Sequence, residues 1–278
     1  MLIEGVKIYP NDKIELEQQI ELNNGLMYAN ANEYTPKALI PSIPWRSPSS
    51  DEYKKLLCRD ASKPPHSTIG LIDLPSSCFD RLKESGFYDL KTIEDFDLFK
   101  ERFDCTDLTS PIMNYLSQNF KTSESASIPP LGTKLPGLPT VSSDLVDGKE
   151  IWVGLHVDRW DRKSINQLNE ARNRICVNLG KEPRFFIFLN LTIAKICRML
   201  EEKVNISVED LFLNHSLLQE FIKHYPKYPL VKIHVYPNQA YIAPTENIFH
   251  DGSTLGMSSL DIQMTLRGHF RISKKQRG

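Results

Sequence analysis

Residues 151–161 read Ile-Trp-Val-Gly-Leu-His-Val-Asp-Arg-Trp-Asp, an apolar run that ends in the polar pair His156 and Asp158. Its composition predicts a strand over Ile151–Val157. Because residues i and i+2 of a strand point to the same side, we expect His156 and Asp158 to project together from the strand end. An imidazole and a carboxylate placed in this way are two of the three ligands of the facial triad that holds iron(II). An ordinary polar strand end would show the same pair, so the metal hypothesis requires a third ligand.

A second stretch, residues 236–254, supplies a candidate for that ligand. It reads as a turn at Pro237, a short apolar strand and then His250 before a glycine-containing turn. The next predicted strand, Leu260–Phe270, carries Arg267 among apolar residues. Burying a guanidinium without a partner is costly, so Arg267 indicates a bound anion, and a carboxylate matches its forked geometry.

The residues from Gly148 onward predict mainly β structure with helical decoration. Apolar and partly alternating runs predict strands at Ile151–Val157, Arg174–Leu179, Arg184–Leu191, Leu230–Tyr236 and Leu260–Phe270. Helical spacing, with a capping pattern at Ser207, predicts an insert of two helices at Thr192–Val204 and Val208–His224. The sequence shows no glycine-rich phosphate loop and no regular alternation of strand and helix, which argues against a parallel α/β fold.

The residues before Gly148 are less regular. Residues 1–120 mix short strands and Pro-rich turns with helices expected at Ser77–Gly86, Thr92–Phe103 and Ser110–Phe120. Residues 122–147 are rich in Ser, Pro and Gly and predict a long loop or a boundary. We expect one compact domain, in which residues 1–120 form a mixed α/β half that packs on the core of residues 148–278 and shapes the substrate pocket. Two domains joined at residues 122–147 are the alternative.

Composition excludes several classes of partner and site. The 34 basic residues nearly balance the 35 acidic ones, and no basic stripe points to nucleic acid. No apolar stretch approaches the length of a membrane span, and the first residues lack the pattern of a signal peptide, so we expect a cytoplasmic protein. The five cysteines contain no Cys-x-x-Cys pair, which argues against a disulfide scaffold and a structural zinc site.

The order His-x-Asp, distal His and then Arg on the following strand resembles the iron(II)/2-oxoglutarate-dependent oxygenase superfamily. The core of that superfamily is a double-stranded β-helix, a jelly-roll of the cupin kind. The resemblance covers about half of the chain, from Gly148 onward, and residues 1–120 add nothing to it. The gap between His250 and Arg267 is long for the family, which makes Arg271 the second candidate for the arginine.

The resemblance implies that His156, Asp158 and His250 bind Fe(II) and that 2-oxoglutarate chelates the metal. The far carboxylate of 2-oxoglutarate would pair with Arg267 or, as the fallback, Arg271. His234 competes as the distal ligand, but the family places this ligand after the strand that follows the turn, which favours His250. The implied protein is an oxidoreductase, a dioxygenase that uses O2 to hydroxylate, desaturate or cyclise a small molecule such as an amino acid or a natural-product intermediate. We expect no nucleic-acid or membrane partner, and the sequence gives no oligomeric state.

Several residues close in sequence to the candidate ligands have possible roles at the site. Glu246, Asn247 and Asp251 are candidates to orient a ligating histidine, because such a histidine usually donates its other N–H to an acceptor. Trp160 and Asp161 follow the ligand pair and either line the substrate pocket or pack in the core. Two arginines at a strand entry, Arg172 and Arg174, are either exposed flanking charges or substrate contacts.

Two other functions remain open at this point. The first is a cupin-like metal-binding or ligand-binding protein without oxygenase activity. The second is a metal-dependent hydrolase, in which zinc-bound water would be the nucleophile. A carboxylate-binding arginine argues mildly against the hydrolase, because such an enzyme needs a general base in that region instead.

Overall fold

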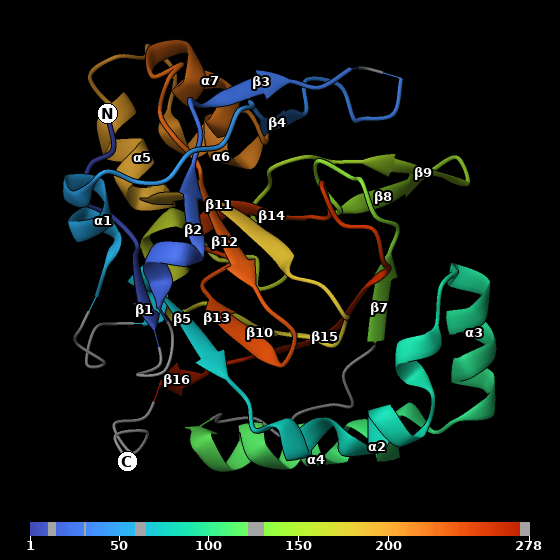
Figure 1. The fold of residues 1–278 in the computed structure, drawn as a ribbon. Helices are drawn as coiled ribbons and strands as arrows, with labels where there is room; N and C mark the ends of the chain where they lie inside the picture. Colours follow the sequence, from blue (N-terminus) through green and yellow to red (C-terminus); the bar gives the residue numbers. More distant parts are fainter. Residues whose placement is uncertain (11–14, 31, 59–64, 122–130, 273–278) are drawn as a thin grey trace.

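The computed structural model describes residues 1–10, 15–30, 32–58, 65–121 and 131–272, and it is built on two sheets (Figure 1). The six-stranded sheet has the order β1 (Lys7–Pro10), β5 (Thr68–Asp73), β13 (Gln239–Ala243), β10 (Asn173–Asn178), β15 (Asp261–Gly268) and β7 (Leu131–Lys134). The four-stranded sheet has the order β14 (Ile248–Ser253), β11 (Arg184–Thr192), β12 (Val231–Val235) and β2 (Ile20–Leu22). All neighbours in these sheets are antiparallel except β1 and β5.

The two sheets pack face to face. The ring of Phe186 on β11 stacks on that of Tyr241 on β13, with centroids 4.2 Å apart. Alternation along β10 explains how the six-stranded sheet buries both faces. Cys176 belongs to the core between the sheets, whereas Ile175 and Val177 belong to a second core on the other face. The predicted mainly-β, jelly-roll architecture is therefore confirmed.

Helices cover the outer face of the six-stranded sheet. They are α2 (Asp80–Glu84), α3 (Ile93–Arg102) and α4 (Cys105–Asn119), and their apolar residues form the second core with that sheet (Figure 1). The helix expected at Thr92–Phe103 is confirmed, with Thr92 as its N-cap. The helix expected from Ser110 begins earlier, because the side chain of Asp104 accepts from Thr106 N and caps it.

Pro111 lies inside α4 without breaking it. A proline there removes the N–H that would bond to the carbonyl four residues earlier, that of Asp107. That carbonyl accepts instead from Ser110 Oγ at 2.8 Å and from Arg81 Nη1 at 3.0 Å. The replacement bonds explain how α4 continues through Pro111, so that the helix begins earlier than the sequence pattern predicted.

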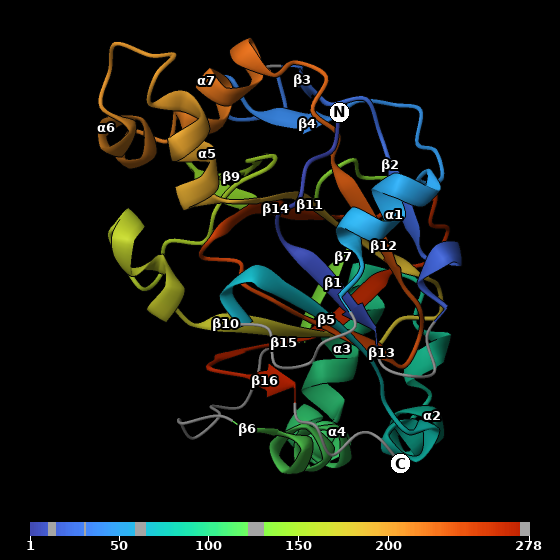
Figure 2. The same cartoon turned by 90° about the vertical axis from the view of Figure 1, so that its left-hand side faces the viewer.

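A helical insert follows β11 and lies at the opposite end of the molecule from α2–α4 (Figure 2). It contains α5 (Ile193–Leu200), α6 (Val208–Leu213) and α7 (Leu217–His224). The single helix expected over Val208–His224 is wrong, because Asn214 ends α6 and His215 takes a left-handed φ of 55°. A left-handed residue of this kind is a common way to end a helix.

Residues before Gly148 contribute strands to both sheets: β1, β5 and β7 to one and β2 to the other. The loop expected over residues 122–147 is wrong in part, because it contains β7 and β8 (Ser143–Val146), which pairs with β9 (Lys149–Trp152). Pairing with β15 forms β7 in a segment whose composition favours a turn, since strand formation depends strongly on context. Residues 122–130 lie outside the described part. Whether the chain folds as one unit stays a prediction.

A charged pair is buried in the core between the sheets. Arg184 of β11 donates from Nε to Asp261 Oδ1 at 2.9 Å and from Nη2 to Oδ2 at 3.3 Å. The two side chains are 2% and 0% exposed, so the pair is isolated from water. In the described residues, no helix has both the length and the apolar character of a membrane span.

Candidate metal centre

The first two predicted ligands lie in an extended segment rather than in a strand. The strand expected over Ile151–Val157 ends at Trp152, and His156 then pairs with His250 of β14 as an isolated bridge. His156 N donates to His250 O at 3.1 Å, and His250 N donates to His156 O at 2.8 Å. Asp158 N donates to Thr245 O at 3.0 Å. Backbone hydrogen bonds therefore hold the segment of His156 and Asp158 against Thr245 and against β14, the strand that carries His250.

Gly154 allows this segment to approach the neighbouring chain. Its φ is +70°, and a Cβ at this position would lie 2.6 Å from Leu39 O. Leu155 N donates to the same carbonyl at 2.9 Å. A side chain at residue 154 would therefore push the segment away from Leu39 and displace His156.

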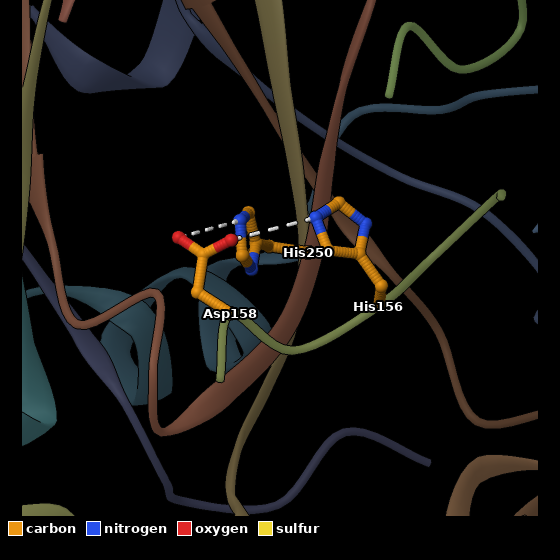
Figure 3. A group of neighbouring side chains, drawn as sticks. All are labelled: His156, Asp158 and His250. Atoms are coloured by element: carbon orange, nitrogen blue, oxygen red, sulfur yellow. Dashed lines mark ion pairs between the residues drawn. The ribbon is translucent and has the colours of Figure 1, made fainter. Parts of the chain in front are cut away.

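The structure brings the three predicted ligands together (Figure 3). His156 Nε2 lies 3.7 Å from Asp158 Oδ1, and His250 Nε2 lies 4.0 Å from Asp158 Oδ2. One ligand atom from each of the three residues can be chosen so that all lie within 4.8 Å of one another. Bonds of about 2 Å to one ion require neighbouring ligand atoms about 3 Å apart, so closure by less than about 1–2 Å completes the site.

One unsatisfied atom shows that the cluster suits a metal ion. His250 Nε2 is buried and has no hydrogen-bond partner in the described residues, and the carboxylate of Asp158 lies 4.0 Å from it. A buried polar atom without a partner typically costs about 1–3 kcal/mol. A cation between His250 Nε2 and the carboxylate would satisfy the nitrogen, so the residues present fit the group that the resemblance implies.

Both buried ligands are in the protonation state that a metal requires. Burial lowers the pKa of His250 to about 3, so its imidazole is neutral at physiological pH. Burial opposes ionisation of Asp158, but in the metal-free protein a hydrogen bond with His156 and the charge of Arg174 outweigh it. The pKa of that carboxyl therefore lies well below its usual range, and the group is a carboxylate.

Each histidine is oriented through Nδ1. This nitrogen lies 3.0 Å from Gly154 O in His156 and 3.2 Å from Ile248 O in His250. A carbonyl can only accept, so Nδ1 of each ring carries a proton, and Nε2 is the nitrogen that can ligate when the ring is neutral. Burial opposes protonation of His156, but Asp158 and Asp251 outweigh it and raise the pKa of His156, so a metal ion would compete there with a proton.

Asp251 is the carboxylate behind His156. It is fully buried, and its Oδ1 accepts from Ser142 Oγ at 2.8 Å and from Gly252 N at 2.7 Å. Its Oδ2 lies 4.0 Å from His156 Nδ1 and has no hydrogen-bond partner among the described residues. Burial raises the pKa of Asp251. Of the three residues proposed from the sequence to orient a ligand, Asp251 is the one that lies beside a ligating ring.

The other sequence candidates lie elsewhere. His234 is on β12 with its Nε2 2.8 Å from Glu21 Oε2, so it does not compete with His250. Glu246 accepts from the backbone of Trp160 and Asp161, and Asn247 donates to His66 O. These contacts hold neighbouring segments together and do not reach a ligating histidine.

Of the three arginines Arg174, Arg267 and Arg271, one lies at the candidate metal centre and two lie away from it. Arg267 Nη2 lies 3.1 Å from Asp161 Oδ1 and 2.8 Å from Glu246 Oε1, and its side chain is absent from the cavity lining. Arg271 is exposed on the short strand β16 (Arg271–Ile272). Arg174 lies at the metal centre, with its Nη2 2.7 Å from Asp158 Oδ2. The sequence left Arg174 open as a flanking charge or a substrate contact, and the structure places it at the ligand.

A cavity of about 670 Å³ opens onto the centre and is lined by His156, Asp158 and Arg174. Three further segments form its walls, namely residues 35–39, the stretch from β7 to β8, and the region from α6 to α7. Trp160 lines it too and is 67% exposed, so its ring lies where the cavity meets solvent. A cavity of this size accommodates a small molecule beside the three ligands.

Comparison with known proteins gives few matches. No protein-family model matches the chain, and no curated protein matches it. Among solved structures, the chain is similar to the Kdo hydroxylase KdoO, described as a non-heme Fe(II) alphaketoglutarate dependent dioxygenase. The complex of KdoO with succinate and Fe(III) is 12% identical, with a TM-score of 0.37 over 75% of this chain and 80% of that one. The apo structure is 11% identical, with a TM-score of 0.38 over 75% and 81%.

Proposed function

We propose that this protein is a non-haem iron(II)- and 2-oxoglutarate-dependent oxygenase that acts on a small molecule. The observation that carries the proposal is the cluster of His156, Asp158 and His250, in which His250 Nε2 is buried without a hydrogen-bond partner in the described residues. Two imidazoles and one carboxylate form the facial triad, which leaves positions open for exogenous ligands. The cavity lies beside these ligands, where such molecules would bind.

2-Oxoglutarate would also need a positively charged side chain at the metal centre. 2-Oxoglutarate carries two carboxylates, of which one chelates the metal with the keto oxygen and the other needs a positive partner. Arg174 lines the cavity, and its Nε is buried without a hydrogen-bond partner in the described part of the chain. We add Arg174 to Arg267 and Arg271 as a candidate for this anchor, and favour it because Arg174 lines the cavity, whereas Arg267 does not and pairs with Asp161 and Glu246.

When bound, iron(II) and 2-oxoglutarate supply an oxidation in which O2 converts 2-oxoglutarate to succinate and CO2 and the substrate C–H bond is oxidised. The chain's own residues ligate through His156, Asp158 and His250 and bind the co-substrate carboxylate through a guanidinium. The apolar side chains Leu155, Leu217 and Leu218 in the lining would limit the access of water to the reacting atoms. Whether the product is hydroxylated, desaturated or cyclised depends on the substrate, and an amino acid or a natural-product intermediate fits the size of the cavity.

Anaerobic addition of iron(II) and then 2-oxoglutarate tests the proposal. We expect a weak visible charge-transfer band that appears only with both, and succinate formation once air is admitted. Absence of the band from protein shown to contain iron would remove the 2-oxoglutarate assignment. A band without succinate would favour a binding protein, and hydrolysis supported by zinc would favour the hydrolase.

A further inference from the structure

Arg159 follows the ligand Asp158 directly and reaches across to the helical insert. Its Nη1 lies 3.4 Å from Phe212 O and 3.2 Å from Leu213 O, the carbonyls at the end of α6. The guanidinium carbon lies 4.8 Å from the centroid of the Phe212 ring. These contacts fix the side chain against α6, and they account for one of its three nitrogens.

The remaining nitrogens of Arg159 have no protein partner. In the described residues, Nε and Nη2 make no hydrogen bond, and no carboxylate lies within ion-pair distance of the group. The contacts with α6 explain a cation at a helix end, where it interacts favourably with the terminal carbonyls. They do not involve Nε or Nη2, which remain available to a ligand.

The surroundings of Arg159 distinguish it from the other cations of the cavity. Lys134 is paired with Glu150 at 2.6 Å, and Arg174 is paired with the ligand Asp158. Arg159 is the third cation in the lining, and among the described residues it is the one without an acidic partner. Asp144 also lines the cavity but is exposed. An anion that enters the cavity can therefore bind Arg159 without displacing a carboxylate of the protein.

His215 supplies a second polar group at the same place. Its Nε2 lies 3.4 Å from Arg159 Nη1, and it also lines the cavity. The residue adopts the left-handed φ of 55° that places it between α6 and α7, a conformation that glycine or asparagine adopts more easily. Burial and the charge of Arg159 lower the pKa of His215, so its ring is neutral near pH 7. A neutral imidazole can donate a hydrogen bond beside the guanidinium.

Apart from Gln219, the rest of this wall is apolar, with Phe212, Leu217 and Leu218 from the helical insert. We infer that Arg159, assisted by His215, binds an oxyanion of the substrate, a carboxylate or a phosphate carried on an apolar body. This inference rests on the proposed function, because it requires that the substrate occupy the cavity beside the iron ligands. Arg159 is then the residue that selects anionic substrates, whereas Arg174 faces the metal.

Binding of simple probes to the metal-free protein tests the inference without iron or 2-oxoglutarate. Benzoate and phenyl phosphate each combine a ring with one of the two oxyanions, and benzyl alcohol is their uncharged counterpart. Isothermal titration calorimetry should show saturable binding of at least one oxyanion. We expect Arg159→Gln to weaken that binding by about tenfold or more, as for loss of a charged hydrogen bond, and to leave benzyl alcohol unchanged. Arg198→Gln is the matched control, because Arg198 is exposed on α5 and lies outside the cavity lining.

A second pair of variants separates charge from folding. Arg159→Lys and Arg159→Met both remove the guanidinium from the end of α6, but only the lysine keeps the charge. We expect the lysine variant to bind the favoured oxyanion at least tenfold more tightly than the methionine variant. Equal affinities in this pair, or the absence of saturable binding of both oxyanions to the wild type, would overturn the inference. The stronger of the two probes identifies the oxyanion as carboxylate or phosphate.

The outcome is separable from the test of the proposed function. The Arg159 variants keep all three iron ligands and Arg174, so the charge-transfer band should survive in them. Loss of probe binding with a surviving band supports the anion site. A missing band in the wild type, with probe binding intact, would reject the cofactor assignment and leave an anion-binding cavity.

Discussion

Arg174 and Arg267 are directly opposed across β10 and β15, and each guanidinium is held by different carboxylates. Arg174 pairs with the iron-ligand candidate Asp158, and Arg267 pairs with Asp161 and Glu246. Like charges in opposed positions repel, so the two sets of acids make this arrangement stable. The separation also means that only one of the two arginines lies at the metal centre.

Replacing each arginine with glutamine should separate their roles. With iron saturating, we expect Arg174→Gln to raise the Kd for 2-oxoglutarate by a hundredfold or more, since breaking a buried charge pair costs about 3–5 kcal/mol. Arg267→Gln should instead lower stability, because it leaves Asp161 and Glu246 without their cation. Titration of the visible band gives the Kd. A large effect of Arg267→Gln or Arg271→Gln, with Arg174→Gln unaffected, would return the anchor to the residues predicted from the sequence.

Alanine at His156, Asp158 or His250 should abolish metal retention and succinate formation. Each variant removes one ligand of the triad, and two ligands do not hold iron(II) through dialysis. Metal content after dialysis against a weak chelator is the measurement. His224→Ala is the control, because His224 lies on α7 beside Glu220 and away from the centre. A variant of the triad that retains one equivalent of iron would remove that residue from the ligand set.

Asp251→Asn should weaken metal binding without removing a ligand. The carboxylate lies behind His156 Nδ1, and loss of such a group typically costs about 10–100-fold in metal affinity. The affinity for cobalt(II), read from its absorption, reports this effect, and the unfolding midpoint shows whether the buried site still packs. Ser142→Ala removes a hydrogen bond to the other oxygen and should have a smaller effect. Unchanged cobalt affinity in a folded Asp251→Asn protein would show that Gly154 O alone orients the ring.

Asp261→Ala should lower the free energy of unfolding by about 3–5 kcal/mol, because Arg184 would be left as a buried, uncompensated charge. Chemical denaturation measures the loss. Asp97→Asn, which removes an exposed pair with Lys100, should change stability by less than about 1 kcal/mol. If the two variants are equally stable, water must reach Arg184.

The three candidate ligands that the structure brings together could be picked out from the sequence because local patterns carried them. His156 and Asp158 are two residues apart, and His250 follows a recognisable turn and strand. The backbone that presents them was predicted less well, since β9 ends at Trp152 and a bridge to β14 replaces the strand. That bridge joins residues far apart in the sequence, and local propensity does not encode such a pairing.

Contacts between residues far apart in the sequence also explain why the positions of Arg174 and Arg267 were not predicted. The strand that carries Arg267 was predicted, but the contacts of its guanidinium depend on Asp161 and Glu246, which are brought to it by the fold. From the sequence, Arg174 was either a flanking charge or a substrate contact, because nothing local shows that β10 lies between β13 and β15. A central strand places its inward side chains in the core, which is how Arg174 reaches Asp158.

Much of the cavity wall comes from stretches of the chain that hold none of the candidate metal ligands. These ligands belong to the segment around His156 and to β14, whose backbones are bonded to each other. Residues 35–39, the β7–β8 region and the α6–α7 region also line the cavity and hold none of them, whereas Arg159 directly follows Asp158. The choice of molecule is therefore encoded partly outside the segments that carry the ligands. For the proposed oxygenase, exchange of the α6–α7 segment would change which compound fits while His156, Asp158 and His250 stay in place, which makes this segment a starting point for re-engineering.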